Sequence, residues 1–280
     1  MKISPFTPLF FDTEPASDGV PSRHLPLWAP TDQIMVQVFC ESGETAPAAA
    51  ILDGISGDEF QPIEWQSWEM NADKTLCFAV IRGLTPGYYK VQIGELVSAV
   101  FRVTDDAFLL SHTTLIQYRF KDNRQRDDVA SVINYMPYFF DWRVPGGFKD
   151  SGWSFGVTNE QFTTQYEDVV ELYATDYLMK TFTLGNAEGV PVWYGEMLNR
   201  VLTCPYVYFN RVRYTRNDGE TPSINTLVDG LDSFVFTQVL RKAHILDAEI
   251  EELNQLILRR IDDDLYRSTY IGSTIYQRKI

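Results

Sequence analysis

The sequence predicts a mainly β fold with a few helices, and three observations support this prediction. Segments that alternate apolar and polar residues, such as Gln33–Cys40, recur about every 8 to 12 residues over the first hundred positions. Aromatic residues, which favour strands, make up 14% of the chain. Helical spacing of apolar residues is clear in two segments, about 190–204 and 246–261. With 280 residues, 45% of them hydrophobic, the chain is long and apolar enough for globular domains.

Residues 1–105 are expected to form a two-sheet β-sandwich after an irregular lead-in at 12–32 that is rich in Pro, Ser and Asp. The expected strands are 33–40, 48–52, part of 60–70, 75–81, 88–93 and 98–103. The most specific segment is Gly83–Ile93, in which Leu84 precedes a Pro-Gly turn and a Tyr pair opens an alternating strand. This corner resembles that of immunoglobulin-like and fibronectin type III domains. The resemblance implies that Leu84 closes the core and that the hydroxyl of Tyr88 or Tyr89 bonds back to the backbone. A simple β-meander is the alternative.

Residues 106–245 are expected to form a second, β-rich domain after a polar break at Thr104–Asp106. The expected strands are 115–120, 162–172, 178–184, 206–215 and 233–240, and a helix is expected over about 190–204, with Pro191 in its first turn. Turns are expected at Pro145-Gly146-Gly147 and Asn217-Asp218-Gly219.

Residues 246–280 are expected to form a C-terminal helix and a tail. The helix has acidic residues in its first turn and Arg259-Arg260 at its end, which complements its dipole. The tail, 268–280, is either a strand that pairs with a neighbouring chain or a frayed terminus.

Charge and cysteine content exclude several classes of protein. The net charge of -14 disfavours binding to nucleic acid phosphates, and the basic residues of the densest basic stretch, Arg119–Arg126, are mixed with Asp122 and followed by Asp127 and Asp128. The chain has three cysteines, an odd and sparse count that indicates buried free thiols in a reducing compartment. Cys40 and Cys77 lie in neighbouring expected strands, so a disulfide between them, with Cys204 left over, is the second option.

The sequence predicts neither a signal peptide nor a transmembrane helix. Met1–Phe11 is broken by two prolines and lacks a cleavage site, and no run of 18 apolar residues occurs. We therefore expect synthesis in the cytoplasm and no membrane insertion.

No motif predicts a metal or cofactor site, and we expect a protein that is not an enzyme. His24, His112 and His244 are far apart in sequence and lie outside metal-binding motifs. Asp262-Asp263-Asp264 are consecutive, so their side chains diverge, and we interpret them as a solvated helix end.

Carboxylates at Glu167, Asp168 and Glu171 allow a weaker hypothesis, a polysaccharide hydrolase that uses a pair of them as glycosidase acids.

The most unusual feature is an aromatic cluster at 135–155, which has three interpretations: core, subunit interface or glycan-stacking platform. A carbohydrate-binding or adhesion protein would use it as the platform. For the interface interpretation the candidate residues, including aromatic residues outside the cluster, are Tyr138, Phe139, Phe140, Trp142, Phe148, Trp153, Trp193, Tyr270 and Tyr276.

The segment Arg143–Arg216 resembles structural tail and neck proteins of tailed bacteriophages that infect Bacteroidetes. The shared pattern consists of R-V-x-G-G-F (Arg143–Phe148), F-x-x-Q (Phe162–Gln165), L-G (Leu184-Gly185), G-V-P-x-W (Gly189–Trp193), L-N-x-x-L-x-C (Leu198–Cys204) and V-x-x-N-x-x-x-Y (Val207–Tyr214). It covers about a quarter of the chain. Pro145 interrupts the first element, and the C-terminal helix is additional.

The resemblance implies a strand–helix–strand unit like that of tail-tube and distal-tail proteins, which build rings. The expected function is therefore that of a non-enzymatic virion protein, a ring, hub or baseplate subunit. Its expected partners are copies of itself and other tail or neck proteins. It would be made in the cytoplasm of the host bacterium and located in the virion.

Overall fold

The computed structural model describes residues 1–11, 24–217, 222–227, 232–243, 248–259, 266–271 and 274–279. The fold is mainly β, with 53% of residues in strands and 10% in helices, which confirms the predicted fold class. The chain divides into two compact units, Met1–His244 and Ile245–Ile280. The boundary expected at 105 therefore falls inside the first unit.

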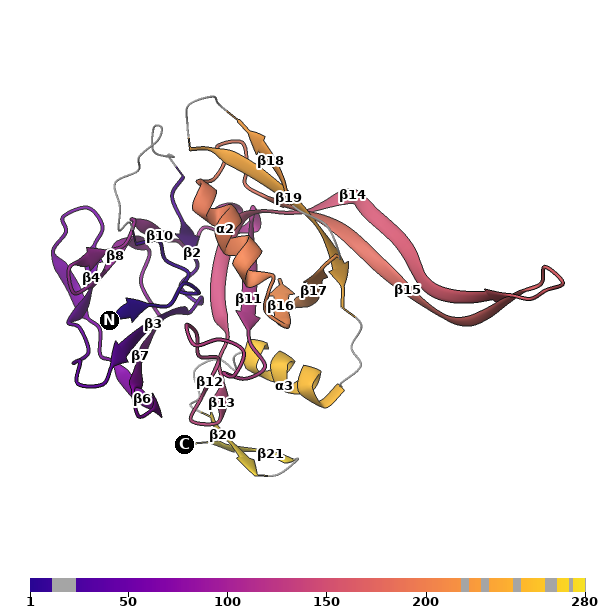
Figure 1. Cartoon of the computed structure of the whole chain (residues 1–280). Coiled ribbons are helices and arrows are strands. Elements are labelled where there is room, and N and C mark those ends of the chain that lie inside the picture. Colours follow the sequence, from indigo (N-terminus) through magenta and orange to yellow (C-terminus); the bar gives the residue numbers. More distant parts are fainter. Residues whose placement is uncertain are drawn as a thin grey trace. The chain divides into compact units, whose positions relative to one another are not determined.

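The first hundred residues form two sheets (Figure 1). The first sheet has the order β1 (Lys2–Ile3), β3 (Ile34–Glu41), β7 (Lys74–Ile81) and β6 (Gln66–Asn71). The second has the order β2 (Leu27–Trp28), β10 (Phe101–Val103), β8 (Gly87–Ile93), β4 (Ala49–Asp53) and β5 (Glu59–Pro62), and β9 (Leu96–Val97) pairs with β8. β2 and β10 are parallel, and the other pairs are antiparallel.

The two sheets share one apolar core, as in a sandwich. Val36 and Val38 of β3 and Val91 and Ile93 of β8 are fully buried in it. The opposite side of the first sheet is also covered, because Phe39, Leu76 and Phe78 pack with Ala130 and Ile133 from the segment that follows. Burial on both sides explains why β3 and β7 are almost continuously apolar. It also explains why the sandwich and the residues after it form one unit.

The corner before β8 has the hydrogen bond that the sequence predicts. The Tyr89 hydroxyl donates to the carbonyl oxygen of Thr85 at 2.9 Å, and Leu84 is buried in the core. Tyr88 is 37% exposed, so Tyr89 is the corner residue. The classification as immunoglobulin-like stays a prediction.

The rest of the first unit is built on a seven-stranded sheet with the order β15-β14-β11-β16-β17-β19-β18. Its strands are β11 (Thr113–Arg119), β14 (Phe140–Thr163), β15 (Val169–Leu184), β16 (Tyr206–Phe209), β17 (Val212–Arg216), β18 (Ser223–Thr226) and β19 (Phe234–Lys242). β15 pairs with β19 as well as β14, so the sheet closes on itself. A small hairpin of β12 (Val132–Ile133) and β13 (Met136–Pro137) precedes β14.

The expected turn at Pro145-Gly146-Gly147 is wrong, because the chain continues through it as one strand. β14 pairs with β11 up to Pro145 and with β15 from Gly146 onward. Gly146 has φ +109°, and a Cβ there would lie 2.1 Å from the carbonyl oxygen of Thr183. The glycine therefore permits close approach of two strands and does not reverse the chain.

Two other expected strands contain turns. The segment 206–215 is the hairpin of β16 and β17, and Asn210 and Arg211 at its tip have φ of 47° and 69°. The segment 162–172 contains the turn between β14 and β15, where Glu167 has φ 64°. The expected turn at 217–219 lies partly outside the described residues.

Helix α2 (Val192–Val201) begins after Pro191, as expected, and buries Tyr194, Met197 and Leu198 against the sheet. Helix α1 (Ala107–Ser111) is capped by Asp106, whose carboxylate accepts from the Phe108 N–H at 2.8 Å. Among the described residues, no helix has the length and apolar character needed to cross a bilayer.

The second unit contains helix α3 (Ala248–Arg259) and the hairpin of β20 (Tyr266–Ile271) and β21 (Thr274–Lys279). The tail therefore contains a hairpin of its own. Whether it pairs with a neighbouring chain stays a prediction. Asp262-Asp263-Asp264 and His244 lie outside the described residues.

The corner hydrogen bond gives a direct test of the sandwich. Tyr89→Phe removes a buried hydroxyl donor and should lower the free energy of unfolding by about 1 kcal/mol in urea titrations. Tyr88→Phe, at the exposed neighbour, is the matched control and should change it by less than about 0.5 kcal/mol. Equal effects of the two substitutions would show that the Tyr89–Thr85 hydrogen bond does not stabilise the sandwich.

Candidate interaction surface

The cysteines and His24 are packing residues, and His112 is exposed. Cys40, Cys77 and Cys204 are buried free thiols, so the expectation of free thiols is confirmed and the alternative disulfide is wrong. Burial lowers the pKa of His24 to about 4, and its ring lies 3.0 Å from the Tyr194 hydroxyl. His112 lies at the end of α1, where its Nδ1 contacts the carbonyl oxygen of Phe108. Within the described ranges, no group of three metal-ligating side chains gathers.

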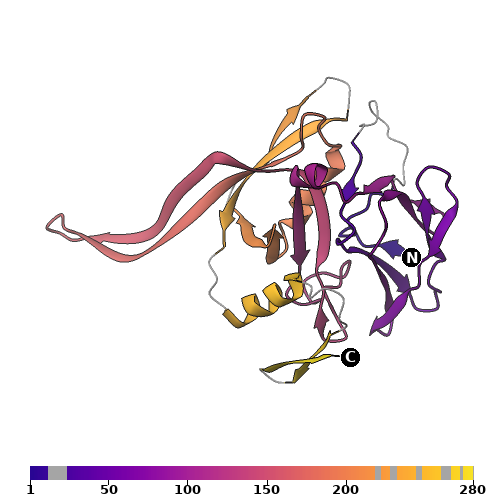
Figure 2. The same ribbon diagram turned by 180° about the vertical axis from the view of Figure 1, so that it is seen from behind.

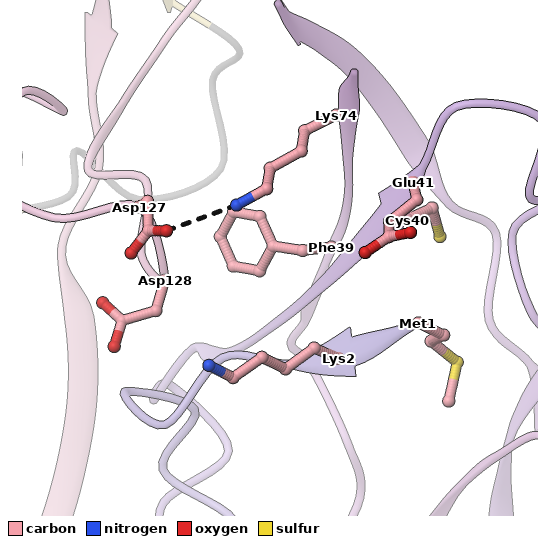
Figure 3. A pocket seen from close by; sticks show the side chains of 8 residues that line it. All are labelled: Met1, Lys2, Phe39, Cys40, Glu41, Lys74, Asp127 and Asp128. Carbon is pink, nitrogen blue, oxygen red and sulfur yellow. Dashed lines mark hydrogen bonds and ion pairs between the residues drawn. The ribbon is translucent and has the colours of Figure 1, made fainter.

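A small concavity between β1, β3 and the loop at 127–128 collects charged groups (Figure 3). Its volume is about 130 Å³, which holds a few water molecules. Lys74 is paired with Asp127 at 3.3 Å, and Asp128 with Arg126. Burial and the neighbouring Cys77 raise the pKa of Cys40 to about 11, so this thiol is not a nucleophile near neutral pH.

A larger groove of about 450 Å³ lies between the N-terminal segment and α2. Trp193 contributes to it and stacks on Phe10, with ring centroids 5.1 Å apart. Trp193 is half-buried by this contact, so its role here is to hold the N-terminal segment on α2.

A polar seam joins the sandwich to the closed sheet, and its central contact is a buried ion pair. Arg143 of β14 donates from Nε and Nη2 to the two carboxylate oxygens of Asp32, at 2.6 and 2.8 Å. The two side chains are 12% and 2% exposed. Asp32 also accepts from the Ala29 N–H, and Arg143 donates to Thr113. Such a bidentate pair fixes both distance and orientation.

Further buried hydrogen bonds extend the seam on both sides of this pair. Asp141 of β14 accepts from the backbone N–H of Gln33 and from the side chain of Gln117. Gln37 exchanges two hydrogen bonds with the backbone of Ala130. These polar groups are satisfied by one another, which identifies the seam as a structural contact and not a reactive site.

The structure separates the aromatic cluster at 135–155 into parts with different roles. Phe139, Phe140 and Trp142 are core residues, so the interface expectation is wrong for them. Tyr138 and Phe148 are half-buried, and Phe148 stacks on Tyr214 with centroids 4.6 Å apart. The exposed members of the cluster are Tyr135, Trp153 and Phe155.

Of the nine candidate interface residues, Trp153 is the one that the structure shows exposed, at 46%. Tyr270 and Tyr276 lie in β20 and β21, and their side chains are outside the described part of the chain.

The main candidate surface is the outer part of the β14–β15 hairpin, which we name the arm (residues 153–178). β15 pairs with β19 only from Met179 onward, so in the arm the two strands pair only with each other. In both views of the chain this ribbon runs beyond the rest of the first unit (Figures 1 and 2). Ten residues at about 3.4 Å each give it a length of about 35 Å.

The arm is rich in exposed apolar side chains. Nine of the large hydrophobic residues that are exposed in the described chain belong to it: Trp153, Phe155, Val157, Phe162, Tyr166, Val169, Val170, Leu172 and Tyr173. The strand register places Trp153, Phe155 and Val157 on one face, and Phe162 and Tyr173 on the other. Phe155 is 81% exposed and Phe162 is 58% exposed. This concentration of exposed apolar surface makes the arm the main candidate for an interaction surface.

The charge of the arm is of one sign. Residues 153–178 contain five carboxylates, Glu160, Glu167, Asp168, Glu171 and Asp176, and no Lys, Arg or His. Glu167, Asp168 and Glu171, the candidate glycosidase acids, lie at its exposed tip. The open turn of a two-stranded ribbon does not enclose a sugar between paired carboxyls. The tip is therefore a better candidate for a contact with a basic surface.

No protein-family model matches this chain, and no curated protein matches its sequence.

The buried ion pair predicts a large difference between two carboxylate substitutions. Asp32→Ala leaves Arg143 buried without its partner and should lower the free energy of unfolding by about 3 kcal/mol. Asp127→Ala removes the exposed pair with Lys74 and should cost less than about 1 kcal/mol. Chemical denaturation of both variants measures the two losses. Similar losses would show that the buried Asp32–Arg143 pair stabilises the fold no more than the exposed pair does.

The buried His24 predicts a stability loss in mild acid. Its folded pKa lies below the usual value of 6.5, so the unfolded chain binds the proton more readily between pH 6.5 and 4. Stability should therefore fall as the pH drops through this window, by about 2 kcal/mol between pH 7 and pH 5 from this group. His24→Gln should remove that part of the pH dependence in denaturation curves, and an unchanged pH dependence would contradict it.

Proposed function

We propose that this chain is a structural subunit of a virion, in a phage tail, neck or baseplate, and that it assembles with copies of itself through the arm. The observation that carries this proposal is the arm, an apolar ribbon with no partner within the described part of its own chain. The local resemblance of residues 143–216 to ring-forming tail and neck proteins supports the same class. In this proposal the sandwich is a peripheral module, and an immunoglobulin-like domain is the type we propose for it.

The apolar area of the arm is sufficient for a specific interface. An aromatic side chain carries about 150–250 Å² of surface. Nine exposed large hydrophobic residues therefore offer on the order of 1,000 Å², which is the area above which a biological interface is credible.

The backbone of the arm supports the same conclusion. Two-stranded hairpins are marginally stable in water without further packing. Pro and Lys are two of the residues that block exposed strand edges in other proteins, and residues 153–178 contain neither. The edges of the arm are thus open to pairing with another chain, and a second copy supplies both the apolar contacts and the backbone partners.

Light scattering of a matched pair of variants tests the proposal. Phe155→Ser combined with Phe162→Ser removes one aromatic anchor from each face of the arm. It should weaken self-association at least about 100-fold, because aromatic anchors dominate interface energies. The control combines Ile55→Ser and Phe108→Ser, which are 81% and 71% exposed elsewhere on the chain, and should assemble like the wild type.

A wild-type mass that stays at the 32.2 kDa monomer at all concentrations, alone and with other virion proteins, would contradict the proposal. So would assembly that survives loss of both aromatic anchors.

A carbohydrate-binding function is the second candidate, since Trp153 and Phe155 share one exposed face of the arm. However, the Lys180 ammonium lies 3.5 Å from the centre of the Trp153 ring and covers it. Glycan-array binding that is lost on Trp153→Ala while self-association is kept would favour this alternative. Trp142 is buried, so its substitution would not test glycan binding at the surface.

A further inference from the structure

A basic concavity lies where the arm leaves the closed sheet. Its volume is about 400 Å³, and its charged lining consists of Arg213, Arg216, Arg241 and Lys242. None of the described residues that line it is a carboxylate. In a chain with a net charge of -14, four cations around one hollow are a local reversal of the overall charge.

The sheet itself brings these cations together. β17 and β19 are antiparallel neighbours, with Tyr214 opposite Lys242 and Thr215 opposite Arg241. The Arg241 guanidinium stacks on the ring of Tyr177, 4.2 Å from its centre, which places the concavity at the base of the arm. Arg216 donates to the carbonyl oxygen of Asn199 at 3.3 Å, which holds its side chain against the end of α2.

Three of the four cations, Arg216, Arg241 and Lys242, have remaining capacity for an anion. Among the described residues, no carboxylate forms an ion pair with Arg216, Arg241 or Lys242. The Nε of Arg216 is buried and has no hydrogen-bond partner there. A guanidinium in this state favours a ligand that accepts hydrogen bonds, such as a carboxylate.

The arm presents carboxylates at its opposite end. We propose that Glu167, Asp168 and Glu171 at the tip of one arm dock in the basic concavity of a second copy. This inference rests on the proposed function, because it names the surface that receives the arm. The five carboxylates of the arm would repel another arm laid alongside, whereas the concavity attracts them.

Geometry makes this contact one between copies. The tip and the concavity are at the two ends of a ribbon about 35 Å long, and a paired ribbon does not fold back on its own base. The contact joins two different surfaces, so two copies related by a two-fold axis exchange arms reciprocally, and any other relation makes the contact heterologous and propagates it from copy to copy. Heterologous contacts form a ring when the rotation between copies closes and a filament when it does not.

Charge reversal at each surface, followed by mixing, tests the inference. The base variant carries Arg216→Glu and Lys242→Glu, and the tip variant carries Glu167→Lys and Glu171→Lys. In each variant alone the tip and the concavity no longer carry opposite net charges, and self-association measured by light scattering should weaken at least about 100-fold. In a one-to-one mixture, the reversed tip matches the reversed base and the two native surfaces match each other. The mixture should therefore associate again.

Controls separate this inference from the proposed function. Arg82→Glu with Lys121→Glu makes the same change in net charge at exposed positions elsewhere and should leave assembly unchanged. If Phe155→Ser with Phe162→Ser abolishes assembly but both charge variants assemble like the wild type, the tip contact is wrong and the arm interface stands. A mixture that stays monomeric also overturns the inference.

Unchanged assembly, with DNA binding that is lost in the base variant, assigns the concavity to nucleic acid instead. A wild-type protein that never associates would contradict both the arm interface and the tip contact.

Discussion

The structure depends on the buried ion pair between Asp32 and Arg143. Asp32 lies just before β3 of the sandwich, and Arg143 lies in the part of β14 that pairs with β11. The bidentate contact therefore joins the two sheet systems at the strand that later becomes the arm. A buried carboxylate and guanidinium tolerate little displacement without losing their hydrogen bonds. The pair therefore fixes the part of β14 that lies in the body.

Because β14 is one continuous strand, the Asp32–Arg143 pair affects the arm as well as the body. A single strand from Phe140 to Thr163 begins among buried residues and ends at the exposed tip. Gly146 allows it to pass from β11 to β15 without a break. The first unit thus consists of a body and an arm. The buried polar groups of the body largely have hydrogen-bond partners, whereas the apolar side chains of the arm are exposed. This division favours assembly as the role of the arm and stability as the role of the body.

The sequence predicts features that depend on local patterns. Alternation marks most strands of the sandwich, the Leu84–Tyr89 corner appears as expected, and Pro191 marks the start of α2. The missed features depend on tertiary context. Pro145-Gly146-Gly147 has the composition of a turn, and only the backbone of β15 beside it explains the glycine. The buried aromatics Phe140 and Trp142 cannot be told from the exposed Trp153 and Phe155 by composition, because all four occupy strand positions.

One sequence signal would have found the arm. Trp153, Phe155 and Val157 alternate with small or polar residues ahead of a polar segment at 163–168, and residues 153–178 contain neither a basic residue nor a proline. The basic concavity gives no such signal, since Arg216 of β17 and Arg241 of β19 have 24 residues between them in the sequence and come together only through sheet pairing.

Hydrogen–deuterium exchange at two protein concentrations tests the central claim most directly, because it reports on the arm without altering it. If the arm is buried against a second copy, the backbone amides of residues 153–178 should exchange markedly more slowly in the assembled protein than in dilute monomer. Amides of β3 and β7 in the body should exchange alike in both. Equally fast exchange of the arm in monomer and assembly would show that the copies meet elsewhere and would contradict the account.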